Sequence, residues 1–493
     1  MPNHLRWLRI ALMLPQRLVP SVVFSSALIL SGCAIPPKAT PAVIEIAPAA
    51  LGLGAEVAPP IQQDWWTLFH DPQVDRLVAQ MLQSNPSLQV AMARIRGAEA
   101  ELAASRSLRQ PQINLDGQVQ ETLLSDEYVL PAPYGGSWRE VEDIQARLTW
   151  SLDFWGKQAA LIDKARTLAE ARGLDALAAR TALAGAFSQS YIGLLMAWQN
   201  IDIARQTIAE RQTILQLAQS RADAGLENET ALEQARALLA AAEVDLMGFE
   251  SDRDLAIHAI AALTGQGTVA YDQIARPSAA LDNLLPLPKA VPADLLSRRP
   301  DILAARARIT AATRGQDAAY ADFYPNIDLT AALGVQAVGL SNFLSPSAIT
   351  TAVGPAIHLP IFDAGKLRAQ YALAGADLDV AVGEYNATVL AAVRQTADAL
   401  SEVQSLAARQ PRQQAVLDSA LRALRLAEER YRLGLSDQIV VLTAEGLLLQ
   451  ARRQMAVLEA QAAAQRVALL LSVGGGVDLS PTKQARQEGP HDD

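Results

Sequence analysis

Two pairs of segments along the chain alternate between apolar and polar residues. The first pair lies within residues 112–154 and the second within residues 326–361. Alternation with a period of two over about ten residues is typical of a β-strand with one face against water. The last segment fits least well, because Pro355 and Pro360 each remove a backbone donor from a strand ladder. The pattern predicts four strands with two unlike faces. In the first pair the apolar positions are Ile113, Leu115, Val119, Leu148, Trp150 and Leu152, and the polar positions between them include Thr149.

Long stretches rich in Ala, Leu, Gln, Glu and Arg follow each strand pair. Residues 157–220 contain no proline, which predicts one helix about 95 Å long at 1.5 Å rise per residue. Residues 229–264 then repeat apolar positions three and four apart, as in a coiled-coil seam. A shorter helix over residues 86–109 precedes the first strands, and its length and that of the 229–264 helix add up to about one long helix. Two short helices can therefore stack end to end beside a long one.

The second half of the chain repeats the first. The segment 85–95 recurs as 299–309 at an offset of 214 residues, and Gly156-Lys157 recurs as Gly365-Lys366 at an offset of 209. A register kept over so long a stretch indicates one architecture duplicated in tandem. The second long helix, residues 366–432, contains Pro411, which predicts a kink or a break there.

The N-terminus has the features of a lipoprotein signal. Arg6, Arg9 and Arg17 precede an apolar run, residues 19–30, that is too short for a stable membrane span but typical of a secretory signal. The run ends in Leu-Ser-Gly-Cys33, which resembles a bacterial lipobox with cleavage before Cys33 and acylation of that residue. Ala34, rather than Asp, follows it, as in outer-membrane sorting. The alternative is an incidental cysteine in an uncleaved leader.

Composition and charge narrow the function. Apolar residues make up 50% of the chain but aromatic residues only 5%, which suits thin helical walls better than a globular core. The formal charge of -10 argues against nucleic acid as a partner. After the leader, no run of about 18 apolar residues predicts a membrane-spanning helix. The five histidines are scattered, so neither a metal site, a cofactor nor catalysis is expected.

Four strands in one chain cannot close into a membrane barrel. In lipid every sheet edge must be paired, and the smallest single-chain membrane barrels have eight strands. Three chains would supply twelve strands, with the apolar faces toward lipid and the polar faces toward a water-filled lumen. The alternative is a soluble sandwich carrying a helical hairpin.

Several motifs then resemble one family. The segment 64–72, with Asp64-Trp65-Trp66 and Asp71-Pro72, is similar to the opening of the TolC-like outer-membrane efflux factors. Segments 152–157 and 359–366 are similar to that family's strand-to-helix junctions, and segment 430–434 to its helix-tip turn. The lipobox points to the lipoprotein branch, the outer-membrane subunits of resistance-nodulation-division efflux systems. The resemblance implies a homotrimer in which a twelve-stranded outer-membrane β-barrel continues into a coiled-coil periplasmic tunnel. It also implies a periplasmic adaptor and an inner-membrane transporter as partners.

The two glycine turns that end the long helices are the predicted working end, about 100 Å from the strands by the helical rise. In each copy an arginine stands four residues before the glycine and a leucine follows it. The candidate adaptor contacts are Arg221, Gly225, Leu226, Arg430, Gly434 and Leu435. Glycine at a helix end is also commonly needed for backbone geometry alone. Asp437 and Thr443 are candidate constriction residues. Thr443 stands in the seam at a position where many members of the resembled family carry an acidic residue, and this departure argues against a carboxylate gate there.

These patterns divide the chain into six parts: a signal peptide (1–32), an acylated extended segment (33–72), a first repeat (73–264), a linker (265–292), a second repeat (293–473) and a disordered tail (474–493). The predicted fold is mostly helical with membrane β-strands. The predicted function is a passive exit duct of a tripartite efflux pump, anchored in the outer membrane and not an enzyme. Two alternatives remain: a lipid-anchored periplasmic scaffold, and the exit duct of a type I protein secretion system.

Overall fold

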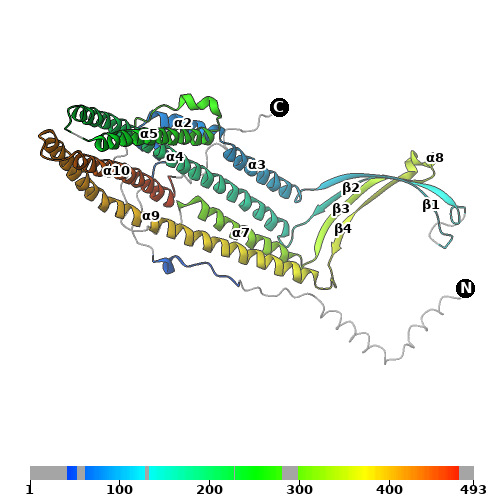
Figure 1. Ribbon diagram of the computed structural model, residues 1–493. Coiled ribbons are helices and arrows are strands. Elements are labelled where there is room, and N and C mark those ends of the chain that lie inside the picture. The colour runs from blue at the N-terminus through cyan, green and yellow to red at the C-terminus, as the bar shows by residue number, and fades with distance from the viewer. Residues whose placement is uncertain (1–41, 53–60, 128–132, 227, 280–297, 477–493) are drawn as a thin grey trace, which may run out of the picture. The chain divides into compact units, whose positions relative to one another are not determined.

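The computed structural model describes residues 42–52, 61–127, 133–226, 228–279 and 298–476 (Figure 1). These residues form two compact units. The strand unit consists of residues 42–44, 98–169 and 308–383, and the helical unit of the other described residues. The signal peptide and Cys33 lie outside the described residues. In the predicted extended segment, Ala42 and Val43 donate backbone hydrogen bonds to Asp379 Oδ1, at 3.0 and 3.1 Å.

The strand unit is built on one antiparallel sheet with the strand order β1-β2-β3-β4. The strands are β1 (Gln112–Leu123), β2 (Trp138–Ser151), β3 (Asn326–Val338) and β4 (Ile349–His358). All four predicted strands are confirmed, but β2 and β4 end three residues before their predicted limits. The difference arises because Asp153 and Asp363 turn the chain into the next helix. Pro355 is tolerated since β4 is an edge strand.

The register gives the sheet two unlike faces. Leu148 of β2 lies opposite Ile113 of β1 and Ala331 of β3, whereas the next residue, Thr149, lies opposite Gln112 and Thr330. Successive side chains of a strand point to opposite faces, so the row through Leu148 is apolar and the row through Thr149 is polar. The predicted alternation of faces is therefore confirmed across neighbouring strands.

The predicted helices appear in the predicted order in both halves of the chain, but α2 and α8 were not predicted. Their bounds are α2 (Pro72–Ser84), α3 (Pro86–Ser107), α4 (Lys157–Asp223), α5 (Glu229–Leu263), α7 (Pro300–Ala321), α8 (Leu340–Phe343), α9 (Lys366–Arg432) and α10 (Gln438–Ser472), with short 3-10 turns η1 (Pro48–Leu51), η2 (Trp65–Phe69), η3 (Thr268–Gln273) and η4 (Pro346–Ala348). The long helices α4 and α9 have 67 residues each and contribute to both units. Among the helices in the described ranges, none combines the length and apolar character that crossing a membrane requires.

Helix α9 runs without interruption through Pro411. The predicted break is therefore wrong, and the alternative of a kink stays a prediction. A proline inside a helix removes one backbone hydrogen bond and costs about 3 kcal/mol, but it does not end the helix when packing holds both sides. Leu406 before the proline packs in a buried cluster with Leu458 and Ala462 of α10, and Leu424 after it belongs to another cluster.

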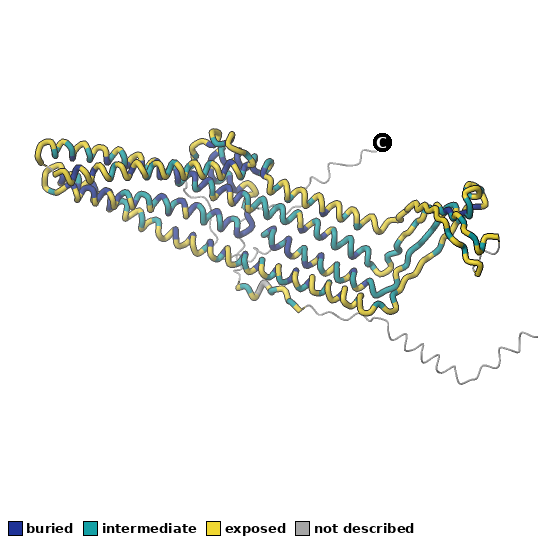
Figure 2. Tube along the Cα trace, turned by 45° about the vertical axis from the view of Figure 1, so that its right-hand side comes forward, coloured by how far each residue is buried: buried dark blue, intermediate teal, exposed yellow. Residues whose placement is uncertain are grey.

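The main core lies in the helical unit, where the tryptophan motif is buried. Trp65 and Phe69 of η2 pack against Met81 of α2 and against Phe187 and Tyr191 of α4. Dark blue buried segments concentrate in this unit, while the strands are mostly intermediate or exposed (Figure 2). The motif that carried the family resemblance is therefore a packing element.

The three glycines at the predicted start of the tail are part of the helical unit. Gly474, Gly475 and Gly476 all have positive φ angles, and a Cβ on them would meet Arg298, Thr181 and Gln62, respectively. Only glycine fits such close approaches without displacing its neighbours. The described structure therefore extends three residues beyond the predicted boundary at 474, and residues 477–493 lie outside it.

Candidate functional site

The two helix tips have the same backbone geometry. Gly225 and Gly434, at φ angles of 70° and 73°, follow the last turns of α4 and α9. Leu226 N–H donates to the carbonyl of Arg221 at 2.8 Å, and Leu435 N–H to that of Arg430 at 2.8 Å. With the glycine N–H bonds to the carbonyls three residues earlier, these contacts form Schellman motifs. Both glycines are thus explained by helix termination.

The leucines after the glycines are not explained in this way. In a Schellman motif the apolar residue after the glycine frequently packs onto the last turn of the helix. Here Leu226 is 68% exposed and Leu435 is 64% exposed. Each tip therefore presents an apolar side chain to its surroundings, as a contact with another molecule requires.

The two tip arginines differ. The guanidinium of Arg221 lies over the ring of Tyr431, 4.7 Å from its centroid, and so links the end of α4 to that of α9. Arg430 donates to the Leu435 carbonyl of its own turn, at 3.5 Å. The sequence predicts that both arginines contact an adaptor, which stays a prediction, and the structure brings Arg221 into a contact within the chain.

The candidate constriction residues are both exposed. Asp437 precedes α10, and its side chain makes no capping hydrogen bond. Thr443 donates its hydroxyl to the Ile439 carbonyl at 2.7 Å, while Val441 and Ala444 form the buried stripe of α10. The interpretation that Thr443 belongs to the packed seam is therefore wrong, because position 443 falls on the other side of the helix. The role of both residues at a constriction stays a prediction.

A buried ion pair near the tips was missed at the sequence level. Arg211 Nε of α4 lies 2.8 Å from Glu445 Oε1 of α10, and the two side chains are 8% and 2% exposed. Arg211 also donates to the Leu238 carbonyl of α5, so one guanidinium joins three helices. Burial raises the pKa of Glu445, and the hydrogen bond and charge of Arg211 only partly oppose this effect. The sequence signal that could have indicated this pair is Glu445, a charged residue within the apolar stripe of α10.

Further polar contacts connect α10 to the first helical hairpin. Arg452 lies 3.3 Å from Glu210 of α4, and Arg453 lies 2.7 Å from Asp245 of α5. By contrast, α9 meets α10 mainly through apolar and small side chains. Within the helical unit, charged groups thus attach α10 to α4 and α5.

The two strand-to-helix junctions are built by carboxylate caps. Asp153 accepts hydrogen bonds from the backbone N–H groups of Gln158 and Ala159, at 3.0 and 2.8 Å. Asp363 accepts from those of Gly365 and Leu367, at 3.0 and 2.8 Å. These bonds satisfy free donors at the starts of α4 and α9, and the negative charge suits the helix dipole. The backbone bonds hold the pKa of Asp363 below its ordinary value.

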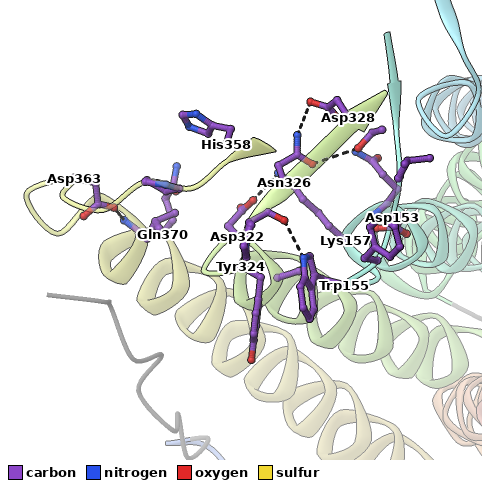
Figure 3. A pocket seen from close by; sticks show the side chains of 18 of the residues that line it. Asp153, Trp155, Lys157, Asp322, Tyr324, Asn326, Asp328, His358, Asp363 and Gln370 are labelled. Atoms are coloured by element: carbon purple, nitrogen blue, oxygen red, sulfur yellow. Dashed lines mark hydrogen bonds and ion pairs between the residues drawn. The ribbon is translucent and has the colours of Figure 1, made fainter. Parts of the chain in front are cut away.

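A cavity of about 530 Å³ lies between the junctions in the strand unit (Figure 3). Lys157 forms an ion pair with Asp322 at 2.5 Å, and Asn326 donates to Asp328 at 2.8 Å. The indole of Trp155 stacks on Tyr324 with ring centroids 4.8 Å apart. The carboxylates of Asp322 and Asp328 thus have partners.

Across the described residues no three His, Cys, Asp or Glu side chains gather as metal ligands do. The named side chains of the cavity thus make structural contacts with one another.

Asp71 of the opening motif organises a third polar cluster. It is 5% exposed and accepts hydrogen bonds from the Tyr191 hydroxyl at 2.5 Å and from the N–H groups of Gln73 and Ser278 at 2.9 and 2.8 Å. Burial alone would raise the pKa of Asp71, but these hydrogen bonds outweigh it, so the pKa lies below its ordinary value of 3.8. Burial also raises the pKa of Tyr191. The ionised carboxylate therefore holds the segment after η3 against α4.

We expect Asp71→Asn to destabilise the helical unit by about 1–3 kcal/mol, because the amide places a donor opposite the Ser278 N–H. A lowered folded pKa means that the carboxylate stabilises the fold above pH 3.8 and loses this effect as pH falls through the folded value. Circular dichroism melting between pH 7 and pH 3 measures both effects. Asp64→Asn, an exposed site without a side-chain capping bond, is the control. An Asp71→Asn variant as stable as the Asp64→Asn control at pH 7 would contradict this role.

Residues 77–266 and 291–475 match the family model described as "outer membrane efflux protein". The chain belongs to the outer membrane efflux protein family. Among its relatives, the fusaric acid resistance protein FusA of Burkholderia cepacia is 35% identical over 365 residues, which cover 72% of this efflux protein and 68% of FusA. The pyoverdine export outer membrane protein OpmQ of Pseudomonas putida is 30% identical over 468 residues, covering 93% and 97% of the two chains.

Solved structures agree with this family. The outer membrane protein VceC of Vibrio cholerae superposes with a TM-score of 0.79 at 32% identity, over 85% of the efflux protein and 100% of VceC. The predicted family is thus confirmed, and with it the location of this efflux protein in the bacterial outer membrane and its function as an efflux channel.

Proposed function

We propose that three copies of the chain close a twelve-stranded barrel in the outer membrane and form the exit duct of a tripartite efflux pump. The observation that carries this proposal is the two-faced sheet, in which β1 and β4 are open edges. An open edge in lipid leaves backbone groups unpaired, and each such group costs several kcal/mol. Pairing β1 of one copy with β4 of the next removes every edge and directs the apolar rows to lipid.

The helices then supply the periplasmic part of the duct. The resemblance to the family implies that the α4–α5 and α9–α10 hairpins line a tunnel and that their tips meet a periplasmic adaptor joined to an inner-membrane transporter. The exposed Leu226 and Leu435 support this arrangement. Substrates pass through without covalent change. The names of FusA and OpmQ refer to fusaric acid and pyoverdine, both small molecules, which favours efflux of small molecules over protein secretion.

A periplasmic scaffold without a channel is the second candidate. It would need the long helices but would have no use for a sheet with a continuous apolar row such as Ile113, Leu148 and Ala331. The sheet therefore favours the duct. The scaffold would still bind partners through its tips, so a test has to measure transport itself.

The test is the double variant Leu226→Asp with Leu435→Asp. We expect trimer formation and membrane insertion to persist, because both side chains are exposed and their backbone geometry does not depend on them. Adaptor crosslinking and export should be lost, since a carboxylate at each tip would have to be desolvated against the adaptor. Export of a fluorescent dye from cells and crosslinking in membranes measure the two effects.

Val269→Asp is the matched control, because Val269 of η3 is 81% exposed in the same unit but far from the tips along the chain. It should export normally. Full export by the double tip variant would remove the tips from the mechanism, whereas loss of export in the control as well would point to a general surface effect.

We also propose that Cys33 is the acylated anchor, as the Leu-Ser-Gly-Cys33 sequence indicates. A lipid chain there supplements the hold of the barrel on the membrane. Incorporation of labelled palmitate into the natural protein, but not into Cys33→Ser, tests the anchor. Labelled, normally processed Cys33→Ser would rule it out.

A further inference from the structure

We propose that the cavity between the two strand-to-helix junctions is a binding site for organic cations that carry an aromatic ring. The cavity lies wholly within the strand unit, where β2 passes into α4 and β4 into α9 (Figure 3). Its volume of about 530 Å³ lies in the range of sites that hold drug-sized molecules. The access of a solute to this site rests on the duct proposed above, whereas binding itself is a property of the cavity.

The polar face of the sheet forms one wall of the cavity. Asp328 of β3 lies opposite Ser151 of β2. His358 of β4 lies opposite Asn326 of β3. All four residues line the cavity and belong to the face that carries Thr149, since alternate residues of a strand share a face. In the proposed barrel this face meets the water-filled lumen, so a dissolved solute reaches the cavity and a lipid does not.

The charge of the cavity favours a cation as its ligand. Lys157 pairs with Asp322, whereas the partner of Asp328 is a neutral amide, that of Asn326. Asp328 therefore keeps a negative charge that this contact does not neutralise. Such a charge attracts a positively charged ligand and repels an anion. The ionised side chains of the lining are four aspartates and two lysines: Asp153, Asp322, Asp328, Asp363, Lys157 and Lys366.

Trp155 and Tyr324 add an aromatic surface to the lining. Their rings stack with centroids 4.8 Å apart and planes 21° apart, so each ring covers one face of the other. The indole N–H of Trp155 donates to the Pro325 carbonyl at 2.8 Å and fixes the ring in place. Trp155 is nevertheless 50% exposed, which leaves its second face open. A cation or another aromatic ring packs favourably on such a face, and tryptophan attracts a cation most strongly.

Gln158 supplies a hydrogen-bond acceptor to the same lining. Its Oε1 atom is buried, and no donor in the described part of the chain bonds to it. A buried acceptor without a donor is unfavourable, and an N–H group of a bound ammonium compound would satisfy it. A metal ion fits less well, because it needs several oxygen ligands and no three acidic or histidine side chains gather among the described residues. The lining therefore favours an organic cation.

Calorimetric titration of the full-length protein in mild detergent tests the class of ligand with matched probes. Naphthylmethylammonium and naphthoate share an aromatic ring and carry opposite charges, whereas cyclohexylmethylammonium keeps the positive charge without the aromatic ring. After subtraction of the heat in protein-free detergent, we expect naphthylmethylammonium to bind at least severalfold more tightly than either of the others. Equal affinities for the three probes, or no saturable binding of the first, would overturn the site.

Variants with opposite expected effects locate the binding. Asp328→Asn should weaken the binding of naphthylmethylammonium severalfold, because it removes the carboxylate without a basic partner. Lys366→Gln should strengthen this binding, because it removes a positive charge from the lining. The matched control is Asp116→Asn, since Asp116 of β1 lies opposite Gln145 on the same polar face but outside the cavity.

Damage to the fold would weaken binding in both cavity variants, so opposite signs exclude it. If Asp328→Asn does not assemble, Lys366→Gln alone decides by the direction of its effect. Changes of the same sign in the two cavity variants, or an equal change in Asp116→Asn, would overturn the site.

Export measurements separate this site from the proposed function. A protein that exports dye but shows no preference for the aromatic cation would overturn the site and leave the duct intact. A protein that binds naphthylmethylammonium with the expected effects of the variants, but forms no conducting trimer, would support the site and overturn the duct.

Discussion

Glu445→Ala is expected to lower the free energy of unfolding by about 3–5 kcal/mol, because it leaves Arg211 charged and buried without its partner. The Arg211 side chain is only 8% exposed, so water cannot replace the carboxylate. Exposing the guanidinium requires α4, α5 and α10 to separate, since it bonds to groups on both other helices. Thermal unfolding in detergent, followed by circular dichroism, measures the change.

Two controls distinguish the loss of the buried ion pair from the effect of removing any charged side chain. Asp398→Ala breaks the exposed pair with Arg394 and should cost at most about 1 kcal/mol. Arg211→Met with Glu445→Leu removes both charges at similar volume and should be close to neutral or stabilising. If Glu445→Ala behaves like Asp398→Ala, the ion pair does not hold the hairpins together.

Leu148→Arg is expected to reduce barrel stability if the sheet spans lipid as proposed, because an arginine on the apolar face must enter hydrocarbon. The cost of such a change is about 2–4 kcal/mol at the bilayer midplane and smaller toward either interface. Thr149→Arg, one residue further on the polar face, should instead assemble normally and change the single-channel conductance. The cross-strand rows place these neighbours on opposite faces. The heat-modifiable trimer band on gels and planar bilayer recordings measure the two effects.

This pair of variants serves as its own control, since both introduce the same side chain at adjacent positions. Equal assembly of Leu148→Arg and Thr149→Arg would show that neither face meets lipid. Reversed effects would mean that the sheet closes with its polar rows outward.

Features encoded in local patterns could be predicted from the sequence. The strands follow from the alternation of apolar and polar residues with period two. The ends of α4 and α9 follow from Gly225 and Gly434, because the hydrogen bonds that end these helices join backbone groups only a few residues apart. The faces of the sheet were also predictable, because an antiparallel register preserves alternation from strand to strand. The ends of β2 and β4 were predicted less accurately. Asp153 and Asp363 cap the following helices through hydrogen bonds that the alternation of residues does not indicate.

Features that depend on distant partners could not be predicted. Arg211 and Glu445 are separated by 234 residues, and nothing in either neighbourhood specifies the other. Likewise, the contact of Arg221 with Tyr431 makes the two tip arginines unequal although their local sequences match. Thr443 was misplaced because a seven-residue pattern read alone does not show which of two adjacent positions faces the partner helix. The break at Pro411 was wrongly predicted because the helix is held on both sides of the proline by packing against residues distant in the sequence.

The buried Arg211–Glu445 pair also constrains how the chain can be rebuilt from its two halves. By the sequence offset of 209 residues, Arg236 occupies the position of Glu445 in the first half, and Ala420 that of Arg211 in the second. A gene made by fusing two first halves would set an arginine where Glu445 now lies, opposite Arg211, and bury two like charges together. A rearranged chain therefore has to keep Arg211 and Glu445 together or replace both.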